Sequence, residues 1–569
     1  AISNSIIQDL IVDMGMPLNI VERTGFKNFM NKLDPKYSII SRRTITRDKI
    51  PKMYDAMLKK LKVICNNAED VSVTLDLWSD RRLRSYMGVT LHTIIDKQNK
   101  SYLLSFLPLA GRHTGENLIS EFEKILQFYS IQKKLVKLVT DNASNMIKAF
   151  DKLILPGFEE YFKEENEEVE YNGDSGSDKI NDDLNEAIDE ALMTIDFKRI
   201  PCFAHTLQLV VNDGIKNSAA VKSSLTKIAK IAKFSHTSTV FAERLEILKA
   251  TIPSNTNIRW NSQFHTITKV VQIDIDKLNI ILYELNKSQL MLTQRDKIII
   301  DEFISLFYLF NEATIQTQAE NSPTISLVGP CLLSILNDLE HEQGKLIYTK
   351  SLCKALIDSL KTRFFGFYEM LSFDMSEYVN KKATTADHYK DSIFLISPIL
   401  DGRFKMHWLE ESNIEDTEKE RVIRKIKNLV CDTCIELNVV KKNEGNAAVP
   451  KLTGGVTSNS VKRKQLFPHL SNLSSSKKLK AEITTTSVSQ EIENFMRETG
   501  MQSSLIFEKS NIYPGLSKLA RKLLCVPATS APIERIFSQS GFLIRRERAR
   551  FTKNNLSQLA LLKCNRSLL

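Results

Sequence analysis

The 569-residue sequence lacks an apolar run near the roughly 20 residues that a membrane-spanning helix needs. Its first segment, AISNSIIQDLIVDMG, carries acidic residues early and has no basic stretch before an apolar core, so no signal peptide is expected. The eight cysteines are scattered, as is typical of reduced thiols in an intracellular protein. We therefore expect no association with a membrane.

Motifs of several enzyme classes are also missing. The sequence contains neither a Gly-rich phosphate loop of Walker type nor an ordered Ser/His/Asp set, which argues against ATPases and serine hydrolases. Only Cys431 and Cys434 form a CxxC pair, within RVIRKIKNLVCDTCIEL. Because a structural zinc site needs four ligands, we interpret this pair as two small residues on a helix.

The composition is that of a folded protein, with 42% hydrophobic and 26% charged residues. A chain of this length exceeds a single hydrophobic core, so two to four structural units are expected. The net charge of +10 is clustered, which favours a phosphate-binding surface, although a solvated face is the alternative for any one cluster. The clusters are Arg42, Arg43, Arg47 and Lys49; Arg81, Arg82 and Arg84; Lys462 to Lys464; Lys477, Lys478 and Lys480; and Arg545 to Arg550.

Hydrophobic periodicity divides the chain into helical and sheet-forming parts. Apolar residues at three- and four-residue spacing predict helices in residues 1–65. The period then changes, and the expected order is strand, strand, strand, helix, strand, helix at 71–80, 85–96, 101–111, 114–129, 134–141 and 142–154. This order is that of a ribonuclease-H-like α/β fold, which other mixed sheets could share.

Later residues form an acidic loop, a return to the sheet and a long helical region. We expect 158–186 to be mobile, FKRIPCFAHTLQLVVNDGI to resume the sheet, and 66–220 to form one α/β unit. Helices follow over 221–520, interrupted by a low-complexity segment at 441–488. Two further helices are expected within 521–569.

Three carboxylates are candidates for a metal-dependent site. Asp76 is expected to end the alternating strand in VTLDLWSD, Asp141 ends LVKLVTD, and Glu534 lies in the helix of TSAPIERIFSQSG. Carboxylates at strand ends can converge at one sheet edge and hold divalent ions for phosphoryl transfer. Taken singly, such an Asp is ordinarily a turn or cap residue, and a helical Glu ordinarily faces solvent.

A series of motifs in fixed order resembles the hobo–Activator (hAT) family of transposases. The motifs are TLDLWSD, HTGENL, VTDNASN, IPCFAHTLQLVVNDG, TNIRWNSQF, LDGRFK and SAPIERIFSQSGFLIRRERARFTKNNLSQLALLKCN. The resemblance runs from about residue 37 to residue 569, and its last block is similar to the family's dimerisation signature. It implies a ribonuclease-H-like core that is interrupted by a large all-helical insertion domain and completed by residues 521–569.

The resemblance also implies an activity. Asp76, Asp141 and Glu534 would be the catalytic acids and would bind Mg²⁺ or Mn²⁺. The implied reaction is cut-and-paste transposition, with cleavage at transposon ends, a hairpin on flanking double-stranded DNA, and strand transfer into target DNA. A domesticated DNA-binding or scaffold protein without catalysis is the alternative; an unrelated ribonuclease-H-like nuclease would not explain the C-terminal block.

Several residues are candidate DNA contacts. Arg259 and Trp260 match the family's RW pair, and Cys202 with His205 matches its CxxH, which places His205 near the scissile phosphate by resemblance. Trp78, two residues after Asp76, could approach DNA. For both tryptophans, Cys202 and His205 the alternative is core packing. The remaining candidates, from the basic clusters, are Arg42, Arg43, Arg545 and Arg546.

The chain departs from the family in two places, and further expectations concern assembly and location. Gly402 replaces the proline of LDPRFK, and no BED-type zinc finger precedes residue 1; since the chain begins without methionine, an upstream segment is expected. The clusters at 462–464 or 477–480 would serve nuclear entry. We predict at least a dimer, formed through apolar positions that could equally pack in the core: Phe537, Leu543, Leu556, Leu559 and Leu562.

Overall fold

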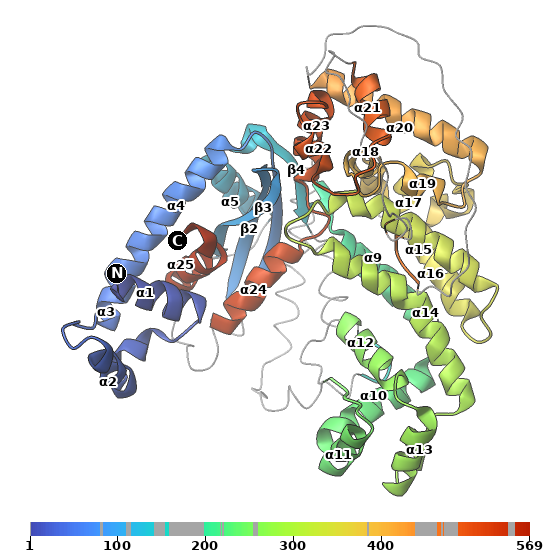
Figure 1. Ribbon diagram of the computed structural model, residues 1–569, viewed down its shortest axis with the longest axis horizontal. Coiled ribbons are helices and arrows are strands. Elements are labelled where there is room, and N and C mark those ends of the chain that lie inside the picture. The colour runs from blue at the N-terminus through green and yellow to red at the C-terminus, as the bar shows by residue number, and fades with distance from the viewer. Residues whose placement is uncertain are drawn as a thin grey trace.

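The computed structural model describes residues 2–79, 84–109, 115–140, 154–158, 199–216, 218, 221–253, 260–383, 386–437, 464–467, 470, 487–543 and 552–569. These residues form two lobes (Figure 1). The sheet lobe holds the N-terminal helices, the β-sheet and the last two helices of the chain, and the helical lobe holds the helices from α9 to α23. None of the described helices combines the length and apolar character that crossing a bilayer requires.

The helices expected in residues 1–65 are confirmed, and they pack onto the sheet. Ile7 and Leu61 are fully buried in the same hydrophobic cluster as Val73 of the sheet, so helices and sheet share one core. The elements are α1 (Ile2–Ser5), the π-helix η1 (Ile6–Asp13), the 3₁₀-helix η2 (Leu18–Glu22), α2 (Thr24–Leu33), α3 (Arg42–Thr44), the π-helix η3 (Ile45–Lys49) and α4 (Ile50–Asn67).

The sheet has five strands in the order β3-β2-β1-β4-β5. The strands are β1 (Val71–Ser79), β2 (Ser85–Ile95), β3 (Gln98–Pro108), β4 (Leu135–Thr140) and β5 (Arg199–Pro201), with helix α5 (Gly115–Phe128) before β4 and the 3₁₀-helix η4 (Gln132–Lys134) leading into it. The first three strands pair antiparallel, whereas β4 runs parallel to β1 and β5. The strands expected at 71–80, 85–96, 101–111 and 134–141 are confirmed; most of the helix expected at 142–154 and of the loop at 158–186 lies outside the described residues.

The predicted return to the sheet over FKRIPCFAHTLQLVVNDGI is wrong for most of its length. Only the three residues of β5 pair, and α9 (Phe203–Lys216) follows at once. Pro201 lacks the N–H that would continue a strand ladder. The buried residues Phe203, Leu207 and Val210 are spaced at helical intervals, so this apolar run covers one side of a helix.

The helical lobe follows the predicted helical pattern after residue 221. Its elements are α10 (Lys222–Thr237), α11 (Thr239–Ile247), α12 (Trp260–Val271), α13 (Ile275–Glu284), η6 (Ser288–Leu290), α14 (Gln294–Thr317), η7 (Ile325–Leu327), α15 (Val328–Gln343), α16 (Lys350–Arg363), α17 (Phe365–Met370), η8 (Ser376–Lys381), η9 (Ala386–Lys390), α18 (Ile393–Leu400), α19 (His407–Glu410), α20 (Asp416–Glu436), α21 (Val488–Met496), α22 (Leu505–Glu508) and α23 (Pro514–Leu524). The described part of the low-complexity segment joins this core, because Leu466 and Phe467 are buried and Lys464 lies 2.8 Å from the Asp338 carboxylate.

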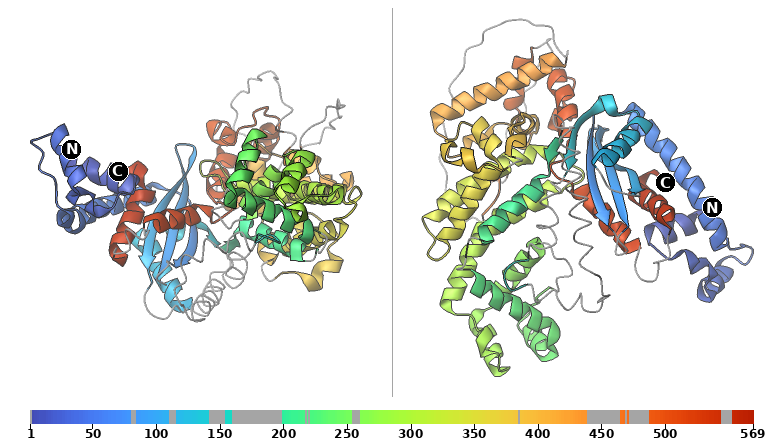
Figure 2. Two further views of the ribbon diagram at one scale, coloured as in Figure 1. Left: turned by 90° about the horizontal axis from the view of Figure 1, so that it is seen from below. Right: turned by 180° about the vertical axis from the view of Figure 1, so that it is seen from behind.

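The last two helices return to the sheet lobe (Figures 1 and 2). Helix α24 (Ala531–Leu543) packs against β1 and β2, and α25 (Lys553–Cys564) packs against β3 and α4. After α25, the amide of Asn565 accepts a hydrogen bond from the backbone N–H of Leu103 at 3.0 Å and donates one to the Leu103 carbonyl at 2.8 Å. In the sequence, the helical lobe therefore comes after β5 and before α24 and α25, the two helices that pack on the sheet.

Candidate active site

Asp76 lies inside β1, the central strand of the sheet, and the expectation that it ends the strand is wrong, because β1 continues to pair with β2 as far as Ser79. It lies on β1 directly opposite Gly88 of β2, and its side chain is 8% exposed. Its Oδ1 accepts a hydrogen bond from the backbone N–H of Leu77 at 2.8 Å. Residues paired across antiparallel strands project to the same face of the sheet, so Asp76 lies on the face to which an added Gly88 Cβ would point.

That face is covered by α24, the helix of Glu534. A Cβ placed on Gly88 would lie 2.4 Å from Cδ1 of Ile533 and 2.9 Å from Cε1 of Phe537. The missing side chain therefore lets α24 approach the sheet at the strand pair that carries Asp76. Glu534 follows Ile533 in the first turn of this helix and is partly exposed.

An aromatic cluster fixes α24 on the sheet. Trp78 stacks on Phe537 with ring centroids 6.0 Å apart and an angle of 9° between the planes, and it also contacts Tyr86 at 5.6 Å and Phe106 at 6.0 Å. Such pairs contribute about 0.5–1.5 kcal/mol beyond the burial of their area. Trp78 is half-buried and packs beside Asp76 as a structural residue in this conformation.

The end of β4 reaches the same strand of the sheet. Thr140 is in register with Leu75, the residue before Asp76. Asp141, the second predicted acid, follows Thr140 in the sequence and lies outside the described residues. The Thr140 hydroxyl accepts a hydrogen bond from Nε of Arg199 at 2.9 Å, which ties the last residue of β4 to β5.

Cys202 joins the end of β4 to the start of α24. Its backbone N–H donates to the Thr140 carbonyl at 3.0 Å, and its Sγ accepts from the backbone N–H of Ser530 at 3.3 Å. Beside it, the N–H of Phe203 donates to the Ala528 carbonyl at 2.9 Å. Cys202 is 1% exposed and therefore packs in the core, and the hydrogen bond that its sulfur accepts was not indicated by the sequence.

Arg535 fixes the first turn of α24 from the other side. Its Nε lies 2.6 Å from the Glu320 carboxylate, and its Nη1 donates to the Gln318 carbonyl at 3.1 Å. Both partners belong to the segment after α14, so this arginine holds the helix of Glu534 against the helical lobe.

His205 and Trp260 are enclosed in the helical lobe. His205 is 1% exposed, and burial, followed by the positive charge of Arg363, lowers its pKa to about 3. Trp260 is 3% exposed and packs against Phe264 and Phe307, with ring centroids 6.0 and 6.3 Å apart. In this conformation neither side chain reaches the surface.

The predicted basic contacts are described only in part. Arg42 and Arg43 are exposed on α3, and Nε of Arg42 lies 3.7 Å from the Glu22 carboxylate. Arg259, Arg545 and Arg546 lie outside the described residues, as do both proposed nuclear-entry clusters except Lys464. Lys464 is engaged with Asp338, so in the folded chain it is held against the helical lobe.

No group of three His, Cys, Asp or Glu side chains within the described ranges is arranged to hold a metal ion; Asp141 is not among these residues. The carboxylate chemistry of the proposed set nevertheless suits magnesium, which prefers oxygen ligands. Cys431 and Cys434 are both free and lie on α20, as expected for two small residues on a helix.

The apolar positions proposed for self-association are used inside the chain. Phe537 is 6% exposed and Leu559 is 1% exposed, and both belong to the hydrophobic core of the sheet lobe. Leu556 and Leu562 are fully buried in the same core, whereas no side-chain environment is described for Leu543. Core packing, the alternative interpretation of these positions, is thus confirmed for Phe537, Leu556, Leu559 and Leu562 within one chain, and their contribution to a dimer stays a prediction.

The sequence analysis missed one residue and one contact of this site. Gly88 lies inside an otherwise regular strand, which is the known signal for close approach of another segment, but the approaching helix is more than 440 residues later in the chain. The link from Cys202 to Ser530 spans a separation of 328 residues, and no local pattern signals it.

Comparison with known families identifies three regions of the chain. Residues 491–565 match the hAT family C-terminal dimerisation region. Residues 74–159 match the ZBED1 RNase-like domain, and residues 200–305 match the ZBED1 RNase-like helical domain. The mixed α/β sheet therefore corresponds to an RNase-like domain, and the adjoining helices to its helical companion.

The individual relatives include one named as a transposase, one as a transcriptional regulator and one as a zinc finger protein. Putative AC transposase of Zea mays is 28% identical over 264 residues, covering 44% of this chain and 28% of the relative. Zinc finger BED domain-containing protein 4 of Homo sapiens is 21% identical over 99% of this chain and 43% of its own length. Putative transcriptional regulator tpeD of Talaromyces stipitatus is 21% identical over 96% of this chain and 60% of its own. In each case the match spans less than two thirds of the relative.

Proposed function

We propose that the chain, whose residues 491–565 match the hAT family C-terminal dimerisation region, is a metal-dependent cut-and-paste DNA transposase of that family. The observation that carries the proposal is the approach of α24 to the central strand at Gly88, which brings the helix of Glu534 over the face that bears Asp76. The third acid is proposed from the strand register. Because Thr140 pairs with Leu75, the next residues, Asp141 and Asp76, are expected at neighbouring positions.

Asp76, Asp141 and Glu534 would hold Mg²⁺ or Mn²⁺ through carboxylate oxygens. When bound, such ions activate an oxygen nucleophile and stabilise the leaving oxygen of an in-line displacement. The chain's own contribution is rigidity. Asp76 is buried on the central strand, and α24 is held by Cys202 from one side and by the Arg535–Glu320 ion pair from the other.

The proposed reaction begins with a water oxygen attacking a phosphodiester at the transposon end. The bond from phosphorus to the 3′ oxygen breaks, leaving a 5′-phosphate and a 3′-hydroxyl. A 3′-hydroxyl then attacks the opposite strand to close a hairpin on flanking DNA, or attacks target DNA in strand transfer. Each transfer forms one phosphorus–oxygen bond and breaks another, so no other energy source is required. Acting on chromosomal DNA, the protein would work in the nucleus.

Substitution of Asp76 tests the proposal. With DNA from the two borders of the gene, wild type should cleave in Mg²⁺ and in Mn²⁺. Asp76→Cys should be inactive in Mg²⁺ and regain cleavage in Mn²⁺, because a thiolate suits the transition metal better. Asp76→Ala should be inactive with both ions.

Glu436→Gln, at an exposed acid of α20 far from the sheet in the chain, is the matched control and should cleave as wild type does. Identical products from wild type and Asp76→Ala would overturn the proposal. Melting curves of all variants distinguish loss of a metal ligand from loss of the fold.

A non-catalytic DNA-binding protein of the same descent is the second candidate. It is favoured by the extent of the matches, since the regulator and zinc-finger relatives align over nearly the whole chain and the transposase over 44% of it. Genomic sequence separates the two. Terminal inverted repeats with short target duplications around the gene support the transposase, and a single-copy gene without repeats supports the alternative.

A further inference from the structure

The far end of the helical lobe carries a disproportionate share of the positive charge. Residues 221–300 contain twelve Lys and Arg against six Asp and Glu, a net charge of +6 within a chain of net charge +10. These residues form α10 to α13 and the start of α14, which make up the lower part of the helical lobe (Figure 1). Such a concentration attracts a polyanion before any specific contact forms.

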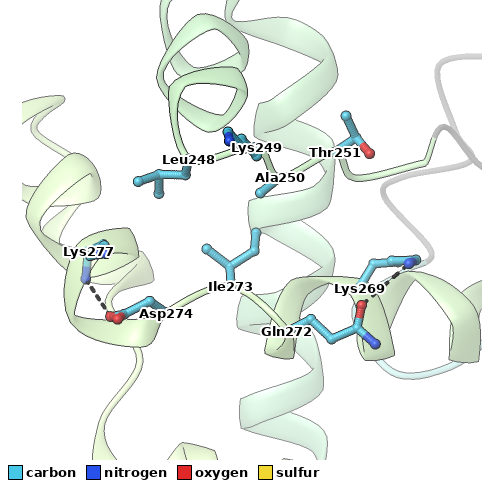
Figure 3. Close-up of a pocket in the computed structure, with 9 residues that line it drawn as sticks. All are labelled: Leu248, Lys249, Ala250, Thr251, Lys269, Gln272, Ile273, Asp274 and Lys277. Carbon is cyan, nitrogen blue, oxygen red and sulfur yellow. Dashed lines mark hydrogen bonds between the residues drawn. The ribbon is translucent and has the colours of Figure 1, made fainter.

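A pocket of about 440 Å³ opens in this region. Lys249 follows α11, Lys269 lies in the last turn of α12, and Lys277 lies in the first turn of α13. The buried side chain of Ile273 lies among the three lysines (Figure 3). Lysines from three different elements therefore line one cavity around a buried isoleucine.

The three lysines outnumber the one acidic residue of the pocket, so its lining residues carry a net charge of +2. Among the described residues no ion pair joins Lys249, Lys269 or Lys277 to a carboxylate; Nζ of Lys269 donates only to the neutral amide of Gln272, at 3.3 Å. The one carboxylate that lines the pocket, Asp274, caps α13 by accepting the backbone N–H groups of residues 276 and 277, each at 3.1 Å.

The backbone of Lys249 adds an independent observation. Its φ is +54°, in the left-handed region that glycine and asparagine adopt more readily than lysine. The N–H of Lys249 donates to the Glu246 carbonyl at 2.8 Å, and the N–H of Ala250 donates to Leu245 at 2.9 Å, so the turn that ends α11 is well formed. A left-handed residue is common at the end of a helix, and here it is a lysine at the rim of the pocket.

We propose that this pocket binds a backbone phosphate of double-stranded DNA, which makes the tip formed by α11, α12 and α13 a DNA contact separate from the catalytic acids. The inference rests on the proposed function for the identity of the polyanion. A phosphate carries the charge and oxygen acceptors that three ammonium groups match, and a pocket on a rigid helical frame fixes the path of the duplex without reading its sequence.

The test uses the full chain and a random-sequence DNA duplex without divalent metal. The triple variant Lys249→Asn, Lys269→Gln, Lys277→Gln should bind about tenfold more weakly at physiological salt, with a salt slope smaller by about one. Asparagine at position 249 suits the left-handed backbone, so the melting temperature should not fall. Lys354→Gln, at an exposed lysine of α16, is the matched control and should bind as wild type does.

Unchanged affinity and salt slope in the triple variant would overturn the proposal that the pocket binds a phosphate. This holds whether or not wild type cleaves DNA with metal. If the triple variant binds DNA more weakly but also melts at a lower temperature, the single variant Lys249→Asn decides the matter. It should keep the wild-type melting temperature and still reduce the salt slope. Wild type that binds DNA through this pocket and never cleaves it would overturn the transposase proposal and leave the pocket standing. The two inferences therefore fail separately.

Discussion

The imidazole of His205 is enclosed within the helical lobe, and this enclosure has a consequence for stability. Its folded pKa of about 3 lies below the value of about 6.5 expected in an unfolded chain. The unfolded state therefore binds the proton first. The stability that neutral His205 contributes is present above pH 6.5 and is lost at about 1.4 kcal/mol per pH unit as the pH falls toward 3.

When the pH is lowered from about 7 to about 5, the melting temperature of His205→Leu should therefore fall less than that of wild type. His265→Gln, at an exposed histidine of α12, is the control and should lose as much as wild type. Parallel acid sensitivity in wild type and His205→Leu would show that the imidazole is not desolvated in solution.

The free energies of stacking and of core packing limit the contact with a DNA base that is considered for Trp260. Stacking of a base on an aromatic ring contributes about 1–3 kcal/mol. Losing a large aromatic side chain from a packed core costs about 3–5 kcal/mol. Stacking alone does not repay removal of this ring from its contacts with Phe264 and Phe307. Base stacking on Trp260 thus requires a rearrangement of α12 that other DNA contacts drive.

The contrast between Asp76 and Trp260 shows what the sequence could predict. The alternating strand pattern around Asp76 was sufficient to place it on a strand, because a period of two is a local property. Whether Trp260 faces solvent or core depends on α14, a helix that begins more than 30 residues later. The motif therefore indicated the residue and left its surroundings open.

At the scale of elements, the packing of α24 on the sheet depends on the absence of a side chain at Gly88. Gly88→Ala would force its new Cβ against Ile533 and Phe537, and overpacking of this kind costs about 1–3 kcal/mol. We expect a lower melting temperature and slower cleavage, because the helix of Glu534 is displaced. Adding Ile533→Val should restore part of both.

Gly25→Ala provides the comparison for that substitution. Gly25 lies on α2 with no atom within 4 Å of an added Cβ, so alanine there should stabilise the helix by about 0.5–1 kcal/mol. If Gly88→Ala is as stable as Gly25→Ala and cleaves at the wild-type rate, α24 does not approach the sheet as closely as described.

The positions of helices and strands along the chain were predicted better than the contacts between them. The helical region predicted over 221–520 is found as α10 to α23, since each helix buries one stripe of its own side chains. The short strand β5 was overextended, because an apolar run can be a buried strand or a buried helix, and periodicity over a few residues does not separate the two. The pairing of α25 with β3 depends on Asn565 and has no local signal.

For the whole molecule, the C-terminal region predicts self-association. Residues 491–565 match a dimerisation region, although the apolar side chains of α25 are already buried within the chain. We expect a dimer or larger assembly by light scattering at micromolar concentration, formed through surfaces other than that buried stripe. A monomer under those conditions would contradict the expectation.

The hydrogen bonds between Leu103 and Asn565 join residues 462 positions apart, and this separation sets a delay during synthesis. At about 5–20 residues per second, the ribosome needs roughly 20–90 seconds to make the intervening chain. Over that interval β3 has emerged while the amide that caps its edge has not. An exposed strand edge is a template for wrong pairing, so slower growth at lower temperature or added chaperone should raise the yield of folded protein more than any single stabilising substitution.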